Sequence, residues 1–524
     1  MFSLLPLSHF LFLLSAVLAK RCDQHRTIPN HEIDWKSCSP DFNETGVSCG
    51  NLVVPLDYSD PCSIETLELK LLKVDAVRSP SKGSILLNFG GPGARGKPPL
   101  AKERELILNL TGGHHDLVTF DPRGTGDTIP FSCYGSDEER ASALNASPRL
   151  SSNASDVALG RIWADGQLFA ETCREAQNET GTFVGTAFVV RDMMRMVDTL
   201  DEDGMLRFWG LSYGTILGAT AAAMFPKKMD KVILDAVANP LDWYANRDSD
   251  LYSDVDKAFS GFCAGCIARP KDCVLAKDNI TASELEAKIY ALFDDLKRNP
   301  IAVPSPSGGI ILDYSMARRW MHAVLYFPLL WTNTARILHS LLTRDIQSLD
   351  GFQDILSSIF PTNNEAKFGI ACSDAFGQTS NISDILPTVY ARHNSSRLSG
   401  DTGEYMLMTC AQWKLPAKER FNGDFRVKTK NPMLVISTLY DPITPLTSAR
   451  NVSETFDGSV LLQQDSYGHG AISQASLCTA KAVRAYFVDG KLPSPNTVCG
   501  TDAVLFSGSS GWDKVFEKLD ADKE

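Results

Sequence analysis

The stretch Leu206–Met224, "LRFWGLSYGTILGATAAAM", carries the strongest fold signal in the chain. An apolar run leads into Gly210-Leu-Ser212-Tyr-Gly214, and small, helix-forming residues follow it. This order predicts a buried strand, a tight turn and a helix, with Ser212 at the turn. A serine in a G-x-S-x-G turn lies on a strained backbone beside a helix N-terminus, which faces developing negative charge. The pattern therefore indicates a nucleophile, and an ordinary turn of small residues is the alternative.

Other short apolar runs that stop near a Gly or Asp lie on both sides of this turn. Together with the run before Ser212 they are residues 84–89, 117–120, 206–209, 232–234, 432–437 and 460–464. Runs that are apolar throughout are typical of strands buried on both faces of a parallel sheet. Helix-compatible segments such as Ala187–Leu200 separate them. This alternation predicts an α/β fold.

The character of the sequence changes between the two groups of strands. From about residue 241 to 421 there are clustered cysteines, the amphipathic stretches Ala282–Leu296 and Met316–Leu342, and few strand signals. We therefore expect a mostly parallel sheet, flanked by helices and interrupted by a largely helical cap. The predicted division is a signal peptide at 1–19, the first part of the core at 20–240, the cap at 241–421, and the second part of the core at 422–524, ending in a charged helix.

Several features indicate a secreted, extracellular protein. The first 19 residues are mostly apolar and end in Val17-Leu-Ala19, which suits a cleaved signal peptide, although no Lys or Arg precedes the apolar stretch and an uncleaved anchor is the alternative. Sequons for N-linked glycans are spread along the chain, at Asn43, Asn109, Asn145, Asn153, Asn178, Asn279, Asn381, Asn394 and Asn451. We expect glycosylation, and no membrane association after signal cleavage.

The 13 cysteines predict a disulfide framework with one cysteine left over. Within the group Cys263, Cys266 and Cys273 we expect local disulfides, because no second CxxC and no nearby His completes a metal site. The net charge of −12 disfavours nucleic acid and anionic membranes as general partners. We expect neither a metal nor a cofactor.

A serine nucleophile needs a base and an orienting acid, which follow it in the order Asp or Glu, then His, when the turn has this form. The histidines after Ser212 are His322, His339, His393 and His469. The first two fall in amphipathic stretches of the cap, and His393 borders the Asn394 sequon, where an exposed loop is predicted. His469 lies in the glycine-flanked loop "SYGHG" directly after a predicted strand, where a base is expected.

The segment "MLVISTLYDPITP" places Asp441 in the loop after the strand at 432–437. Because the carboxyl ends of parallel strands share one edge of a sheet, Asp441 and His469 should emerge beside Ser212. We predict Asp441 as the acid and His469 as the base. A turn Asp preceding Pro442 and an exposed loop His are the alternatives.

A glycine-rich loop, "GGPGARG" at 90–96, follows the strand at 84–89 and fits the G-x-G-x-x-G pattern of dinucleotide sites. We disfavour that interpretation because "GKPP" at 96–99 should break a helix, and because Asp116 begins a strand instead of ending one. The loop suits an oxyanion hole. We predict N–H donors from Tyr213 and Gly91, with Gly90 as the alternative to Gly91, since Pro92 has no N–H.

As a set, these motifs resemble the secreted tripeptidyl-aminopeptidase-like and prolyl-aminopeptidase-like branch of the α/β-hydrolase fold. The resemblance spans most of the chain and includes "CGNLVVPLDYSDP", "NFGGPGARG", "FDPRGTGDTIPFSC", "LYDPITP" and "SYGHG". The family usually has Pro or His where this chain has Phe89, and Ser where it has Arg95. Both departures flank the oxyanion loop and concern substrate preference.

The resemblance implies a serine hydrolase that cleaves peptide bonds near substrate N-termini through an acyl-enzyme. It also implies a carboxylate in the cap that holds the substrate ammonium, for which Asp374 in "ACSDAFG" is the candidate; a solvated Asp beside a disulfide is the alternative. The substrate would be a peptide or a small acyl compound. A carboxylesterase or lactonase, and a non-catalytic binding protein on the same fold, are the alternatives for the function.

Overall fold

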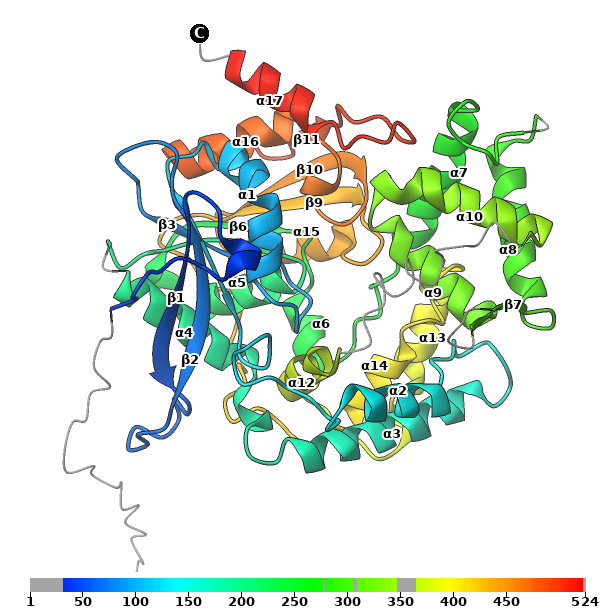
Figure 1. Cartoon of the computed structure of the whole chain (residues 1–524), viewed down its shortest axis with the longest axis horizontal. Helices are drawn as coiled ribbons and strands as arrows, with labels where there is room; N and C mark the ends of the chain where they lie inside the picture. The colour runs from blue at the N-terminus through cyan, green and yellow to red at the C-terminus, as the bar shows by residue number, and fades with distance from the viewer. Residues whose placement is uncertain (1–31, 201, 278, 305–308, 346–363, 522–524) are drawn as a thin grey trace, which may run out of the picture.

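The computed structural model describes residues 32–200, 202–277, 279–304, 309–345 and 364–521. Within them, a nine-stranded sheet has the order β1-β2-β4-β3-β5-β6-β9-β10-β11 (Figure 1). β1 and β2, and β2 and β4, pair antiparallel, and the other neighbours pair parallel. The strands are β1 (Val47–Pro55), β2 (Thr66–Val74), β3 (Ser84–Asn88), β4 (Asp116–Asp121), β5 (Leu206–Leu211), β6 (Met229–Asp235), β9 (Leu434–Tyr440), β10 (Val460–Tyr467) and β11 (Val498–Gly500). The predicted mostly parallel sheet is confirmed.

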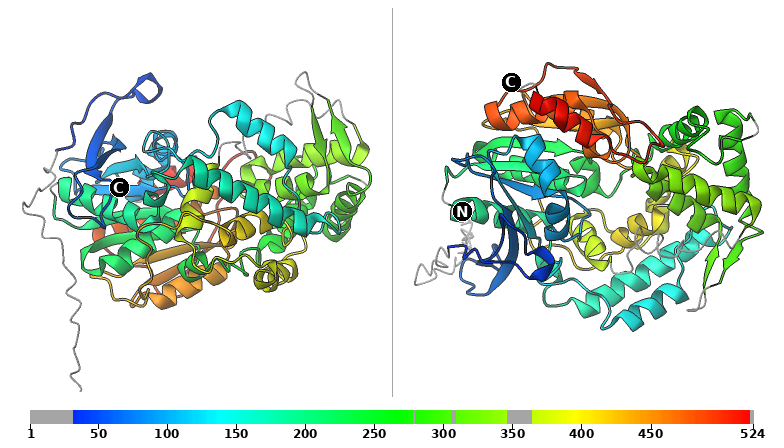
Figure 2. Two further views of the ribbon diagram at one scale, coloured as in Figure 1. Left: turned by 90° about the horizontal axis from the view of Figure 1, so that it is seen from below. Right: turned by 45° about the horizontal axis from the view of Figure 1, so that its top comes forward.

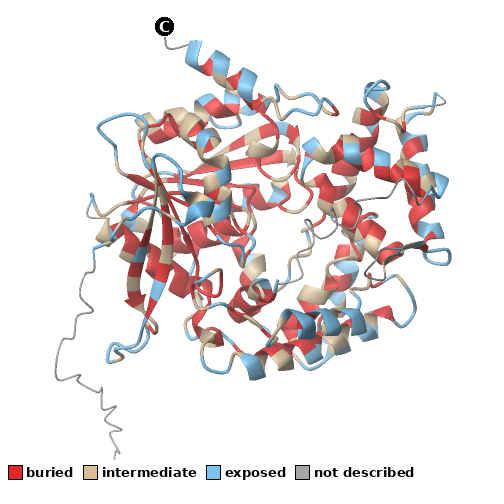
Figure 3. Ribbon diagram, viewed as in Figure 1, coloured by how far each residue is buried: buried red, intermediate tan, exposed pale blue. Residues whose placement is uncertain are grey.

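Helices cover both faces of this sheet (Figure 2). One face carries α1 (Lys97–Thr111), α16 (Leu477–Asp489) and α17 (Trp512–Ala521), and the other carries α4 (Thr186–Thr199), α5 (Tyr213–Met224) and α15 (Leu446–Thr455). Successive residues of a strand point to opposite faces. Accordingly, Ile85 and Leu87 pack in the core beneath α1, α16 and α17, whereas Leu86 packs in the core beneath α4, α5 and α15. The central strands are buried almost throughout (Figure 3), as their apolar sequences predict.

Helix α1 corrects one expectation. It begins at Lys97 and includes Pro98 and Pro99 in its first turn, where the sequence pattern was expected to break a helix. Proline is tolerated there because the first N–H groups of a helix have no acceptor within the helix. Asp116 does begin β4, as predicted.

The insertion between β6 and β9 is largely helical and forms two lobes. Its elements are α6 (Pro240–Ala245), α7 (Val255–Ala268), α8 (Ala282–Asp295), β7 (Ile301–Val303), β8 (Ile310–Leu312), α9 (Tyr314–Leu325), α10 (Trp331–Thr343), α12 (Glu365–Asp374), α13 (Leu386–Ser395) and α14 (Glu404–Ala411). One lobe, α7 to α10, encloses its own hydrophobic core around Phe262, Trp320 and Trp331. The stretch predicted at Met316–Leu342 forms two helices, separated at Phe327-Pro328.

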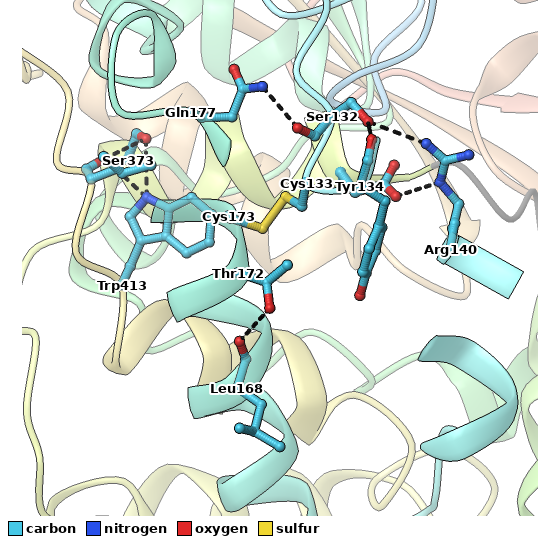
Figure 4. Close-up of a disulfide and its surroundings, with 12 residues drawn as sticks. Ser132, Cys133, Tyr134, Arg140, Leu168, Thr172, Cys173, Gln177, Ser373 and Trp413 are labelled. Atoms are coloured by element: carbon cyan, nitrogen blue, oxygen red, sulfur yellow. Dashed lines mark hydrogen bonds and ion pairs between the residues drawn. A yellow bond between two sulfur atoms is a disulfide. The ribbon is translucent and has the colours of Figure 1, made fainter. Parts of the chain in front are cut away.

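The second lobe joins α12, α13 and α14 to two helices from earlier in the chain, α2 (Asp137–Ala146) and α3 (Ala158–Ala176) (Figure 1). Phe169 of α3 packs edge-on against Phe368 of α12, and Arg140 of α2 forms an ion pair with Glu365 of α12. A disulfide between Cys133 and Cys173 fastens α3 to the loop after β4 (Figure 4). The range 20–240, predicted as core, therefore contains a segment that packs with the cap.

The predicted disulfide framework is confirmed by five cysteine pairs: Cys38–Cys49, Cys133–Cys173, Cys266–Cys273, Cys372–Cys410 and Cys478–Cys499. Cys266 pairs with Cys273, and Cys263 is the free, buried cysteine of the described chain. Separately, among the described helices none combines the length and the apolar character that crossing a bilayer requires.

Candidate active site

Ser212 occupies the turn between β5 and α5, as predicted. Its backbone has φ 57° and ψ −124°, a conformation that residues with a side chain rarely adopt. Close packing explains the glycines on either side. A Cβ on Gly210 would lie 2.2 Å from the carbonyl oxygen of Gly214, and a Cβ on Gly214 would lie 2.4 Å from that of Asn88. The side chain of Ser212 is therefore presented at the start of a helix, where N–H groups are free of intrahelical partners.

The glycine-rich loop after β3 packs directly on this turn. A Cβ on Gly90 would lie 2.7 Å from the Cβ of Ser212, so only glycine allows the approach. The N–H of Gly90 donates to Oδ1 of Asn88 at 3.0 Å. In the described part of the chain the N–H of Gly91 has no acceptor. This difference favours Gly91 over Gly90 as an oxyanion donor, beside Tyr213 at the first position of α5.

Asp441 and His469 meet where β9 and β10 end. Nδ1 of His469 lies 3.0 Å from Oδ2 and 3.1 Å from Oδ1 of Asp441. Oδ1 also accepts the N–H groups of Ile443 and Thr444, both at 2.9 Å, and Oδ2 accepts that of Gly470 at 3.1 Å. Burial acts to raise the pKa of Asp441, but the charge and hydrogen bond of His469, with these donors, outweigh burial and hold it below its ordinary value. Asp441 is thus an ionised partner for the imidazole.

Asp235, the last residue of β6, lies between the turn at Ser212 and the loop of His469. Its carbonyl accepts the N–H of Ser212 at 3.1 Å, and its Oδ1 accepts the N–H of Ala471 at 3.0 Å. In the described structure the Ser212 hydroxyl makes no hydrogen bond to His469. Such bonds are often long without substrate and shorten in the reacting complex. Asp235 was not among the predicted residues, because the sequence shows it only as the polar end of an apolar run.

The cap contacts the acid and base loops through helix α9. Just past its end, the carbonyl of Tyr326 accepts the N–H of His469 at 3.0 Å, and the two rings lie 4.9 Å apart. Earlier in the helix, Nε2 of His322 lies 2.9 Å from the carbonyl oxygen of Pro442, next to Asp441. Burial lowers the pKa of His322 to about 4, so its ring is neutral near pH 7 and donates this hydrogen bond. Neither contact was predicted, because in the sequence His322 and Tyr326 are simply two positions of an amphipathic stretch.

The remaining histidines of the prediction lie elsewhere. His339 belongs to α10, as expected for a cap helix. His393 was expected in an exposed loop, but it lies in the last turn of α13 with Nε2 2.7 Å from the Ser152 hydroxyl. The prediction was wrong because the sequon marks an exposed Asn394, whereas its neighbour faces inward.

Asp374 is fully buried at the end of α12. It accepts hydrogen bonds from the N–H and hydroxyl of Thr186 and from the indole N–H of Trp243, the last at 3.0 Å. The Thr186 hydroxyl also contacts the Tyr213 hydroxyl at 2.6 Å. Burial raises the pKa of Asp374 to about 6 despite these donors. The carboxylate therefore supports the residue after Ser212, and its contact with a substrate ammonium stays a prediction.

No cluster of His, Cys, Asp and Glu in the described residues could hold a metal ion.

A buried ion pair organises the segment "FDPRGTG" that follows β4. Arg123 pairs with Asp192 through Nε at 2.6 Å and Nη2 at 2.9 Å, and it donates to the carbonyls of Leu56 and Pro55. These contacts of Arg123 link the segment after β4 to α4 and to the end of β1.

Comparisons with known proteins agree with this geometry. A family model described as "alpha/beta hydrolase fold" matches residues 83–292, and one described as "TAP-like protein" matches residues 396–499. The chain is 27% identical to a tripeptidyl aminopeptidase of Streptomyces lividans over 90% of this chain and 87% of that protein. It is 27% identical to serine protease Hip1 of Mycobacterium tuberculosis, over 89% of this chain and 91% of that protein. It is also 26% identical to carboxylesterase B of the same species, over 89% of each.

These matches cover both the segment around Ser212 and the segment with Asp441 and His469. The sheet order, the strained serine turn and the Asp–His pair are the features that an α/β-hydrolase needs. The chain is therefore a serine hydrolase of the α/β-hydrolase superfamily, in its tripeptidyl-aminopeptidase-like branch.

Proposed function

We propose that this enzyme is a peptidase that cleaves amide bonds near the N-termini of peptide substrates, with Ser212, His469 and Asp441 as its catalytic residues. The observation that carries the assignment is the contact of Nδ1 of His469 with Asp441. The loop of His469 is held next to the Ser212 turn by Asp235, which accepts hydrogen bonds from both segments. The similarity to a tripeptidyl aminopeptidase and to a serine protease supports the peptide substrate.

The mechanism follows from the chemistry of these groups. Oγ of Ser212 attacks the acyl carbon while Nε2 of His469 accepts its proton, and Asp441 stabilises the resulting imidazolium. The N–H groups of Gly91 and Tyr213 stabilise the oxyanion of the tetrahedral intermediate. His469 then gives the proton to the leaving amine, and an acyl-enzyme remains. A water molecule then attacks the acyl carbon while His469 takes its proton, and His469 returns this proton to Oγ of Ser212 as the acid leaves.

The secretory assignment belongs to this proposal. Of the nine sequon asparagines, Asn109 is partly buried and the others are exposed, so their side chains are accessible to glycans. The disulfides suit an oxidising compartment. The predicted signal peptide at 1–19 lies outside the described residues.

The experiment compares Ser212→Ala with the wild type on a tripeptidyl amide that has a free N-terminus. We expect kcat/KM to fall by about 10⁴-fold or more, because the nucleophile is removed while the fold is kept. Ser81→Ala, an exposed serine far from the turn, is the matched control and should behave as wild type. Turnover retained in Ser212→Ala would refute the assignment.

An esterase or lactonase is the second candidate, favoured by the similarity to a carboxylesterase. The same tripeptidyl amide with an acetylated N-terminus, and a simple acyl ester, separate the two functions. A peptidase of N-termini should prefer the free amine strongly. Rapid ester hydrolysis, with neither amide cleaved, would support the second candidate. If a fluorophosphonate failed to label Ser212, a binding protein would be favoured.

A further inference from the structure

Asp235 is placed to act on both the nucleophile and the base. Its backbone carbonyl accepts the N–H of Ser212, and its Oδ1 accepts the N–H of Ala471, two residues after His469. The position of Gly470 shows how close the base loop lies, because a Cβ there would be 3.6 Å from Oδ1 of Asp235. A single rigid strand end therefore sets the position of the Ser212 turn relative to the base loop.

The second oxygen of Asp235, Oδ2, is buried and has no hydrogen-bond partner within the described structure. The groups that face this carboxyl are the N–H groups of Ala471 and Ala236, the imidazole of His469 and the carboxylate of Asp441. Burial, helped by the charge of Asp441, raises the pKa of Asp235 to about 7 against the effect of Ala471 and His469. Asp235 is therefore neutral in mild acid and ionised in mild alkali.

The geometry points to Asp235 as a second carboxyl group that serves His469, by positioning the base loop and, once ionised, by adding negative charge near the imidazolium. This inference rests on the proposed function, because it requires His469 to be the base. Asp235 neither gives nor receives the transferred proton, which moves from Oγ of Ser212 to Nε2 of His469 and then to the leaving group. The charge of Asp235 acts only through space.

This role predicts a contribution that depends on pH. Below about pH 6 the carboxyl is protonated, so the wild type and an Asn variant present the same charge to His469. Above about pH 8 the wild type carries an additional negative charge that stabilises the imidazolium of the transition state. An interaction equivalent to one pKa unit corresponds to roughly a tenfold change in rate.

The test is the pH profile of kcat/KM for wild type and Asp235→Asn, from about pH 5 to pH 9. Asn keeps an oxygen to accept from Ala471 but cannot ionise. We expect near-equal rates at the acid end and a deficit of roughly tenfold at the alkaline end, with little change in KM. Asp465→Asn, at an exposed position near the end of β10, the strand that precedes the loop of His469, is the matched control and should follow the wild type.

A loss of equal size at every pH would overturn the charge effect and leave Asp235 as a structural residue. An unchanged profile would overturn the charge effect, and so would a profile of Asp465→Asn that matched that of Asp235→Asn. The positioning role is tested by Asp235→Ala, which removes the acceptor for the N–H of Ala471 and should lower kcat/KM at every pH. A wild-type rate in Asp235→Ala would overturn the positioning role. Failure of the proposed function is recognised separately, because turnover would then survive in Ser212→Ala. If Asp235→Asn does not fold, the pH profile of kcat/KM for the wild type is the test. The inference requires the ionisation of Asp235 in addition to that of the base, so a rise of kcat/KM with a single ionisation between about pH 5 and pH 9 contradicts it.

Discussion

The carboxyl ends of β9 and β6 each present a fully buried aspartate, yet the two differ in charge. Asp441 receives three backbone N–H groups and the imidazole of His469, and these outweigh burial to keep its pKa low. Asp235 receives the N–H of Ala471 on one oxygen while the other has no partner in the described chain, and its pKa is about 7. Both side chains are fully buried, so the additional donors and the imidazole of His469 account for the lower pKa of Asp441.

The largest expected effect comes from removing the charge of Asp441. Asp441→Asn should lower kcat by about 10⁴-fold, because the amide no longer stabilises the imidazolium and favours the wrong tautomer of His469. Steady-state kinetics with the tripeptidyl amide measure the loss. A loss of less than tenfold would show that Asp441 is not the orienting acid.

A third buried aspartate, Asp192, has its full complement of partners in Arg123 and Tyr58. Arg123→Met should lower the free energy of unfolding by about 3–5 kcal/mol, because a buried charge is left without its counterion. Denaturant unfolding measures this change. Arg174→Met, which breaks a surface pair with Glu171, is the control and should cost about 1 kcal/mol or less.

The two strand-end aspartates should affect stability with opposite dependence on pH. The raised pKa of Asp235 makes the folded state lose stability as pH rises from about 4 to about 7, so Asp235→Asn should gain roughly 2–4 kcal/mol relative to wild type across that window. The lowered pKa of Asp441 stabilises the folded state above its unfolded pKa, near 3.8, and this contribution is lost as pH falls below that value.

Melting temperatures of the wild type and both Asn variants at several pH values check this prediction. Asp441→Asn should be less stable than wild type near pH 7, and the difference should shrink in acid. Parallel curves for the two variants would contradict the contrast between the two carboxyl groups.

The smallest expected effect concerns Asp374. Asp374→Asn places an amide nitrogen where Trp243 and Thr186 now donate, and the lost acceptor should cost about 1–3 kcal/mol of stability. Thermal unfolding measures this cost. KM for substrates with free and acetylated N-termini tests the substrate role. A KM raised only for the free amine would identify Asp374 as the ammonium site, and equal changes would leave it a structural support for Tyr213.

Local patterns predicted much of this molecule. The turn at Ser212 was recognisable because strand, glycines and helix lie within 19 consecutive residues. The loops of Asp441 and His469 were recognisable for the same reason. The two prolines at the start of α1 led to a wrong prediction, because proline occurs both in the first turn of a helix and where a helix is broken. Only the conformation of the neighbouring turns distinguishes the two cases.

Contacts between distant segments could not be predicted in this way. Helix α3 joins the cap through apolar contacts with α12 to α14, which lie beyond β6 in the sequence, and α2 joins it through the ion pair of Arg140 with Glu365. The contacts of His322 and Tyr326 with the acid and base loops depend on how the cap folds back onto the core. No short pattern encodes such packing.

The sequence by itself determined the chemistry: a serine on a strained turn, an aspartate and a histidine on loops after strands, and a glycine-rich loop near them. Those features depend on local backbone rules that act within a few residues. Only the tertiary structure decided which carboxyl groups are ionised and which cap residues support the base. Charge and orientation in a buried site depend on donors and neighbours that distant parts of the chain supply.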